Sequence, residues 1–136
     1  MYPPEIVMPM KQDLTSVGIK ELLTPKDVDN ALKADGTTLL VINSVCGCAA
    51  GNCRPAVKAA IKHSKTPDNL TTVFAGFDVE AVAQARQLMA PYPPSSPCIA
   101  LFKDGNLVHF IERHHIEGRS PEMIADNLTG AFDEFC

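Results

Sequence analysis

The sequence contains no long apolar run. No segment approaches the roughly 18 consecutive apolar residues of a membrane-spanning helix, so no such helix is expected. Residues 1–5 also lack the basic segment, followed by an apolar one, that begins a secretory signal peptide. Both absences favour a cytosolic location, which is a reducing compartment.

Positive charge is scarce. Lys and Arg total 12 against 16 Asp and Glu, the net charge is −4, and the basic residues are scattered. Electrostatic binding to nucleic acid or to anionic lipid needs a basic surface, so we expect neither as a partner. The 136 residues contain no internal repeat and correspond to one ordinary domain. We therefore expect a single domain over residues 1–136, with proline-rich residues 1–18 as an N-terminal extension that holds at most a short helix near residues 11–17.

Several familiar catalytic patterns are missing as well. No Ser-His-Asp or Cys-His arrangement, phosphate-binding loop or carboxylate pair stands out, and the paired CxxC layout of a structural zinc site is absent. The sequence does contain five cysteines, which in a reducing compartment indicate catalysis or metal binding before structural bridges. The count is odd, so a monomer keeps at least one unpaired thiol. The five are Cys46, Cys48, Cys53, Cys98 and Cys136.

The order of apolar and turn residues predicts alternating strands and helices. Residues 37–45 are β-rich and almost continuously apolar, as in a strand buried on both faces, and they lead directly into the first two cysteines. Pro55 should kink the following helix or mark a late start. Strand–helix units followed by a hairpin and a last helix imply an α/β fold, with a mixed central sheet and helices on both faces, whose order resembles the thioredoxin fold. The expected strands are 20–23, 37–45, 70–75, 98–102 and 107–111; the expected helices run from Thr24 to Gly36, from the cysteines to about His63, over 78–89, and onward from Ser120.

Cys46 and Cys48 are the candidate catalytic residues. Cys46 lies where the strand gives way to a helix, and unpaired N–H groups at a helix start stabilise a thiolate. Gly47 permits a tight backbone and adds no bulk against a substrate. Cys48 is near enough to attack a mixed disulfide on Cys46, but residues two apart in a regular helix point about 200° away from each other. Closing the pair then needs local distortion, which favours a relatively oxidising couple suited to isomerisation or to removal of thiol adducts.

A second segment, Ser95-Ser96-Pro97, precedes the first hairpin strand. In thioredoxin-like folds the proline at this place is cis and packs over the active site. We therefore expect a cis bond between Ser96 and Pro97, and substrate contacts at Gly47, Ser96 and Pro97.

The segment Asn43–Gly51, which reads NSVCGCAAG, resembles the bacilliredoxins, thioredoxin-like bacterial proteins with a CGC site. The resemblance covers nearly the whole chain from about Met8. It implies removal of bacillithiol from S-bacillithiolated protein cysteines, or disulfide isomerisation, with Cys46 as nucleophile and Cys48 as resolving cysteine. It also implies no bound organic cofactor, and as partners it implies proteins carrying mixed disulfides and a low-molecular-weight thiol. Further segments that carry the resemblance are residues 54–56, 65–69, 73–76, 94–97, 109–118 and 131–136.

Two alternatives use the same cysteines. Zinc or an iron–sulfur cluster could in principle be held by Cys46, Cys48 and Cys53, with Cys98 or His63 as a fourth ligand. The missing four-ligand layout argues against it, and we expect no metal. A non-enzymatic redox-sensing module is the second alternative, which the sequence leaves open.

The other cysteines and the histidines receive structural interpretations. Cys53 lies about two helical turns, or roughly 10 Å, after Cys46, too far for a direct disulfide, and is expected to be a small buried or half-buried residue. Cys98 is expected to face the core, and Cys136 to be a free thiol in the tail. His114 and its neighbour His115 are expected in a solvated turn, and His63 is expected to complement a helix dipole.

Overall fold

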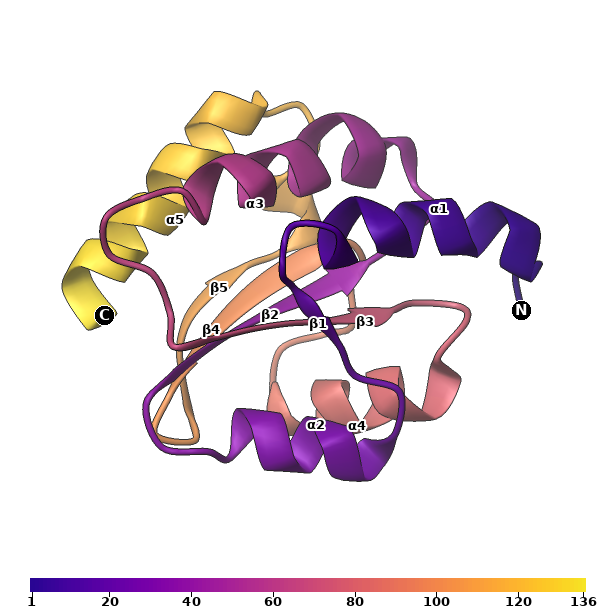
Figure 1. The fold of residues 1–136 in the computed structure, drawn as a ribbon, viewed down its shortest axis with the longest axis horizontal. Coiled ribbons are helices and arrows are strands. Elements are labelled where there is room, and N and C mark those ends of the chain that lie inside the picture. The colour runs from indigo at the N-terminus through magenta and orange to yellow at the C-terminus, as the bar shows by residue number, and fades with distance from the viewer.

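The computed structural model describes residues 1–136, which fold around a five-stranded sheet of order β1-β3-β2-β4-β5 (Figure 1). β1, β2 and β3 are parallel, whereas β4 runs antiparallel to β2 and to β5. The expected α/β class with a mixed sheet is therefore confirmed. The strands are β1 (Lys20–Glu21), β2 (Thr37–Asn43), β3 (Asn69–Phe74), β4 (Cys98–Lys103) and β5 (Asn106–Ile111).

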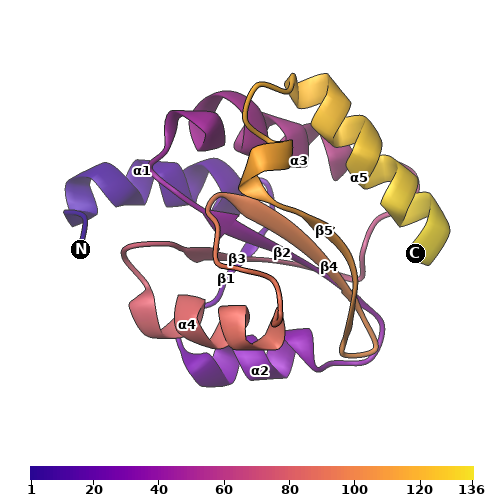
Figure 2. The same cartoon turned by 180° about the vertical axis from the view of Figure 1, so that it is seen from behind.

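Helices cover both faces of the sheet, as expected. Figures 1 and 2 show α1, α3 and α5 on one face and α2 and α4 on the other. Two separate hydrophobic clusters fill the spaces between the sheet and these two helical layers. The helices are α1 (Pro4–Thr15), α2 (Pro25–Leu32), α3 (Arg54–Ala60), α4 (Val79–Leu88) and α5 (Pro121–Phe135).

The central strand β2 is buried along its whole length. Successive side chains of a strand point to opposite faces, and Leu39 and Val41 accordingly join one hydrophobic cluster while Leu40 and Ile42 join the other. This two-sided burial explains why the strand reads as an unbroken apolar run. Its rigid end at Asn43 is the point from which the cysteine segment departs.

The N-terminal segment differs from its prediction. The helix α1 begins at Pro4 instead of near Lys11, and Pro9 lies inside it. Pro4 is tolerated because the first turn of a helix needs no N–H donor, whereas Pro9 lies beyond that turn. Val7 and Leu14 are fully buried, so packing against the rest of the fold stabilises a helix that local sequence preferences argue against.

The helix after the cysteines starts late, as Pro55 indicates. A π-helical turn, η1 (Ala49–Cys53), comes first, and Pro55 occupies the first turn of α3. Two other helix starts follow their sequence signals. The Thr24 hydroxyl accepts a hydrogen bond from the Asp27 N–H at 3.1 Å, and Ser120 caps α5 in the same way.

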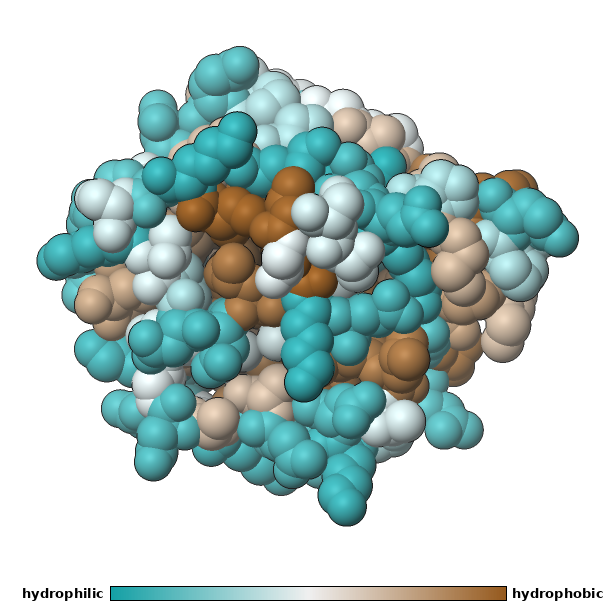
Figure 3. Space-filling view, viewed as in Figure 1, coloured by the Kyte–Doolittle hydropathy of each residue, from teal (hydrophilic) through white to brown (hydrophobic).

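The outer surface is mainly polar. Figure 3 shows hydrophilic side chains around a smaller apolar area near the centre of the face seen in Figure 1. None of the helices combines the length and the apolar character needed to cross a bilayer.

Candidate active site

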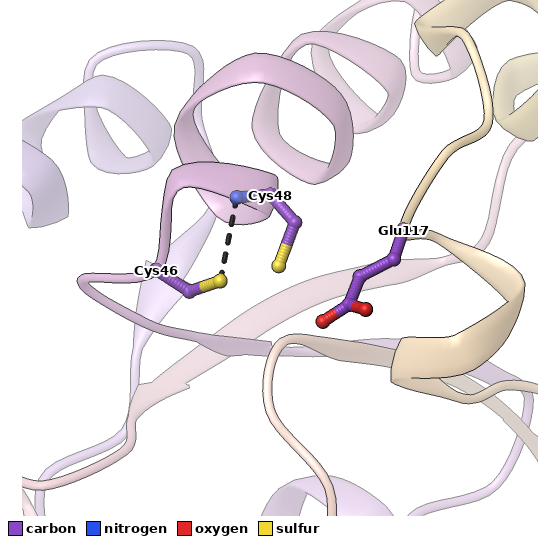
Figure 4. A group of neighbouring side chains, drawn as sticks. All are labelled: Cys46, Cys48 and Glu117. Atoms are coloured by element: carbon purple, nitrogen blue, oxygen red, sulfur yellow. Dashed lines mark hydrogen bonds between the residues drawn. The ribbon is translucent and has the colours of Figure 1, made fainter.

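Cys46 lies at the N-terminal end of the helical segment that follows β2. Its carbonyl accepts hydrogen bonds from the N–H groups of Ala49, at 2.9 Å, and Ala50, at 3.3 Å. Its Sγ accepts the N–H of Cys48 at 3.3 Å, and both thiols are half-buried (Figure 4). The start of the helix therefore directs a backbone donor at the first sulfur, as expected from the sequence.

The two thiols are electrostatically unequal. The pKa of Cys46 is lowered, chiefly by the thiol of Cys48 acting as a hydrogen-bond donor, with further contributions from the Cys48 and Ala49 N–H groups and from the Arg113 cation; burial opposes the shift. Burial raises the pKa of Cys48 to about 11, assisted by its hydrogen bond to Cys46 and by the negative charges of Cys46 and Glu117. Cys46 is thus the thiol that ionises first, and Cys48 holds its proton.

Arg113 and Glu117 belong to this site although the sequence analysis did not select them. Arg113 lies in a 3₁₀ turn, η2 (Arg113–His115), and its Nη1 donates to the Ser96 carbonyl at 3.3 Å. Its Nε pairs with the Glu117 carboxylate. The pairing with Glu117, followed by the proximity of Cys46, raises the pKa of Arg113. The Arg113 guanidinium therefore contacts the segment before Pro97 and the Glu117 carboxylate, and its positive charge acts on the Cys46 sulfur.

Glu117 reaches the cysteine pair from the loop between η2 and α5. Its carboxylate and the sulfurs of Cys46 and Cys48 lie within 4.8 Å of one another. Figure 4 shows the Glu117 side chain extending from its loop toward the side on which the two cysteines lie. Cys53, Cys98 and His63 do not join this group, so the four donors of a closed structural zinc site are not assembled.

The topology of the hairpin could have revealed Arg113. Ile99 of β4 pairs with Ile111 of β5, so the residues just before β4 and just after β5 must meet. Arg113 accordingly approaches Ser95 and Ser96. Spacing along the chain carries no such signal, because the contact arises only when the hairpin closes.

Gly47 lies between the two cysteines in the chain, and Ser96 is joined to their surroundings through Arg113. The bond between Ser96 and Pro97 is cis, as expected, and the bond between Ala90 and Pro91 is also cis, which was not expected. Gly47 is exposed, and a methyl group there would meet no atom within 4 Å. Its backbone also lies outside the left-handed region, so neither backbone conformation nor crowding requires glycine here. Substrate contact by these three residues stays a prediction.

A buried polar network holds the residues that connect β2 to Cys46. The Arg54 guanidinium is only 5% exposed, and its Nη1 donates to the side-chain oxygen of Asn43 at 3.0 Å and to the Ser44 carbonyl at 3.1 Å. The Ser44 hydroxyl in turn accepts the Cys46 N–H at 3.1 Å. Since buried polar groups need partners, this network fixes where the chain leaves β2.

The same network reaches α1. The Nε of Arg54 donates to Asp13 at 3.1 Å, and the Nζ of Lys58 donates to the other carboxylate oxygen at 2.6 Å. Partial burial opposes ionisation of Asp13, but Lys58 and Arg54 hold its pKa below the usual value. The N-terminal helix thereby braces the cysteine segment.

The three remaining cysteines do not join the group formed by Cys46, Cys48 and Glu117. Cys53 and Cys98 are almost completely buried, in hydrophobic clusters on opposite faces of the sheet. Burial raises the pKa of Cys53 far above its usual value and that of Cys98 to about 12. Cys136 is exposed and lies near Thr37, at the opposite end of β2 from Cys46; burial of its thiol raises its pKa. The predictions of buried positions for Cys53 and Cys98 are confirmed.

The histidines contribute contacts away from the pair. His114 and His115 are exposed in η2, as predicted for a solvated turn. His63 forms a 2.8 Å contact with Asp133 of α5. A specific side-chain partner was missed by the sequence interpretation, which assigned this histidine to a helix dipole.

Sequence comparison assigns the chain to a family. A model of a family described as disulphide isomerase matches residues 2–136. A bacilliredoxin from Cytophaga hutchinsonii is 60% identical over 134 residues, covering 98% of this chain and 99% of the relative. A bacilliredoxin from Halalkalibacterium halodurans is 54% identical over 136 residues, covering 99% and 94% respectively. The chain belongs to the bacilliredoxin family.

Solved structures support the thioredoxin-like fold. A thioredoxin from Malassezia sympodialis has a TM-score of 0.58 at 16% identity and covers 87% of this chain and 90% of its own. Mitochondrial thioredoxin 3 from Saccharomyces cerevisiae, in its oxidized form, has a TM-score of 0.57 at 19% identity and covers 87% and 98%. The family assignment and this fold together identify the chain as a thiol–disulfide oxidoreductase.

Proposed function

We propose that this protein removes a low-molecular-weight thiol, bacillithiol or its equivalent, from mixed disulfides on protein cysteines. Cys46 acts as the nucleophile and Cys48 as the resolving cysteine. The observation that carries this assignment is the pairing of two facing sulfurs with different surroundings. The Cys46 sulfur accepts a backbone N–H at the helix start, while the Cys48 thiol is the more deeply desolvated.

The first step transfers the adduct. The Cys46 thiolate attacks the small-thiol sulfur of the protein mixed disulfide, so that a new S–S bond forms on Cys46 and the old one breaks. The protein cysteine leaves as a thiolate and is protonated from water. No electrons are gained or lost overall, because one disulfide replaces another.

The second step releases the small thiol. The Cys48 thiolate attacks the sulfur of Cys46, the internal disulfide forms, and the small thiol leaves. The protein is then oxidised by two electrons and needs a thiol reductant for the next cycle. A second molecule of small thiol can instead attack the adduct on Cys46, which regenerates the free thiol without Cys48.

Other parts of the proposal follow from the same chemistry. The reaction needs no organic cofactor, because the sulfurs carry all the bonds made and broken. Disulfide isomerisation begins with the same attack by Cys46, and the family model's description favours it as a second activity. Clients are proteins carrying mixed disulfides, and the cytosolic location expected from the sequence is part of the proposal.

The deciding experiment uses a model protein thiolated with bacillithiol, mixed with variants and analysed by intact mass and peptide mapping. Cys46→Ser should accept no adduct, whereas Cys48→Ser should accept it and accumulate the mixed disulfide on Cys46. Cys53→Ala is the matched control and should behave as the wild type. If Cys46→Ser accepts the adduct and Cys48→Ser does not, the two roles are reversed. If neither substitution matters, the proposed function is wrong.

A further inference from the structure

Glu117 is an acidic side chain in the immediate surroundings of the cysteine pair. It reaches the pair from a segment far along the chain, and its carboxylate lies within 4.8 Å of both sulfurs. In Figure 4 the Cys48 sulfur lies on the side of the pair nearer to the Glu117 carboxylate, whereas the Cys46 sulfur points to the Cys48 N–H. The geometry thus gives each sulfur a different neighbour.

Cys48 needs such a neighbour. Its thiol is half-buried, and with a pKa of about 11 only a very small fraction is ionised at neutral pH. Attack on a disulfide requires the thiolate, so an unassisted Cys48 would resolve slowly. The titratable and charged groups around it are Cys46, Arg113 and Glu117, with the buried thiol of Cys53 behind it in the core. Of these, the carboxylate is the group that can take up a proton while Cys46 carries an adduct.

We propose that Glu117 accepts the proton of the Cys48 thiol when Cys48 resolves the mixed disulfide on Cys46. This inference rests on the proposed function of the pair. It assigns Glu117 a catalytic role that neither the sequence pattern nor the family name states.

The state of Cys46 decides when the proton moves. While Cys46 is a thiolate, it attracts the Cys48 proton and its negative charge opposes ionisation of Cys48. Once Cys46 carries the adduct, that charge is gone and the competing acceptor is lost. The carboxylate of Glu117 then stands as the acceptor beside the thiol.

The chemical step balances. The Cys48 proton passes to a carboxylate oxygen of Glu117, and the Cys48 sulfur forms a bond to the Cys46 sulfur. The bond between Cys46 and the small thiol breaks, the small thiol leaves with the electron pair, and the proton on Glu117 passes to it directly or through water. In this step one disulfide replaces another, so the Cys48 sulfur is oxidised as the sulfur of the small thiol is reduced. The cysteine pair is oxidised by two electrons only over the two steps together.

Arg113 positions this carboxylate. Its Nε pairs with the Glu117 carboxylate, which holds that side chain beside the cysteine pair. The Glu117 side chain is 50% exposed, so water can carry its proton to the departing small thiol. The same arginine lowers the pKa of Cys46, so one cation serves both steps.

If Glu117 acted only through its negative charge, Glu117→Gln would change the rate of resolution in the opposite direction. The negative charge of Glu117 raises the pKa of Cys48. If that were its whole effect, Glu117→Gln would lower this pKa, increase the thiolate fraction and speed resolution. If Glu117 is the proton acceptor, Glu117→Gln slows resolution.

The test is a single-turnover reaction, in which the reduced protein is mixed with a bacillithiol mixed disulfide and quenched with acid at intervals. Mass analysis separates the adduct on Cys46 from the internal disulfide, which gives a rate for each step. In Glu117→Gln we expect the first step within about twofold of wild type and the second slowed about 10- to 100-fold near neutral pH. The difference should shrink as the pH rises toward the pKa of Cys48, because hydroxide replaces the base.

Two variants sharpen the result. Glu117→Asp keeps a carboxylate and should recover part of the second-step rate, while Glu122→Gln changes an exposed carboxylate in the first turn of α5 and should match the wild type. A second step that is unchanged or faster in Glu117→Gln would overturn the inference, as would equal slowing of both steps. Absence of any adduct on Cys46 in the wild type would instead overturn the proposed function.

Discussion

Cys46 and Cys53 lie seven residues apart in one chain segment, yet their surroundings differ in almost every respect. Cys46 is half-buried at a helix start, where the Cys48 thiol, N–H donors and a nearby cation lower its pKa. Cys53 is fully buried in a hydrophobic cluster, where burial raises its pKa far above the usual value. The contrast shows that burial and neighbouring groups, rather than the presence of a cysteine in this segment, determine which thiol ionises readily.

Cys98 extends the comparison to the other side of the sheet. It follows Pro97 directly and so lies close to the candidate site along the chain, but its side chain belongs to the cluster covered by α2 and α4. The alternation of side chains along a strand separates neighbours in sequence onto opposite faces. Cys98 is therefore a core residue.

The largest effect separates Cys46 from Cys53. Cys46→Ser should lower the rate of adduct removal by at least about 100-fold, because the nucleophile is lost. Cys53→Ala should retain the rate and lose about 1 kcal/mol of unfolding free energy through the small cavity it leaves. Adduct removal followed by mass, together with urea unfolding, measures both. A large loss of rate in Cys53→Ala, with the fold retained, would erase the distinction.

The next effect concerns the network beneath the site. Arg54→Met should lower the free energy of unfolding by about 2–4 kcal/mol, because Asn43 and the Ser44 carbonyl lose their buried donor. Lys58→Met removes the more exposed partner of Asp13 and should cost less than about 1 kcal/mol. Urea denaturation of both variants checks the order. Equal costs would mean that the buried contacts add nothing beyond a surface ion pair.

Arg113 should have a smaller effect on the pH dependence of Cys46. The cation lowers the Cys46 pKa, so Arg113→Met should raise that pKa and decrease the thiolate fraction below it. Alkylation of Cys46 at about pH 6 should slow about two- to fivefold, and the two proteins should converge at alkaline pH where both are ionised. Arg119→Met is a control on the same loop. A faster reaction in Arg113→Met would show that the sign is wrong.

The smallest expected effect is the absence of one. Cys46, Cys48 and Glu117 offer three donor atoms, one fewer than a closed structural zinc site needs. The purified protein should therefore carry no stoichiometric zinc or iron. Elemental analysis checks this, with Cys46→Ser as the comparison. About one metal ion per chain, lost in that variant, would favour a metal-binding function over catalysis.

Local signals predicted the elements that frame the site. The apolar run of β2, the capping residues Thr24 and Ser120, and the position of Pro97 each act through neighbours in the sequence, and the structure agrees with them. The strand ended at Asn43, two residues before its predicted limit, because the buried network turns the chain there. Element boundaries of this kind depend on tertiary partners.

The parts that residue spacing alone could not predict come from distant segments. Arg113 and Glu117 reach the cysteines only because the β4–β5 hairpin returns the chain to the site. The early start of α1 depends on burial of Val7 and Leu14, which offsets the unfavourable Pro9. Spacing in the sequence carries no record of such contacts.

Competitive alkylation of the five reduced cysteines tests the central claim most directly. The native protein is treated with a limiting amount of iodoacetamide at about pH 6, denatured, and fully labelled with an isotopically heavy reagent before peptide mapping. Cys46 should carry the light label well before the other four, because its thiolate is both accessible and stabilised. Cys48 should follow only at higher pH, and Cys53 and Cys98 only after unfolding. Preferential light labelling of Cys53 or Cys136 would contradict the assignment of Cys46 as the nucleophile.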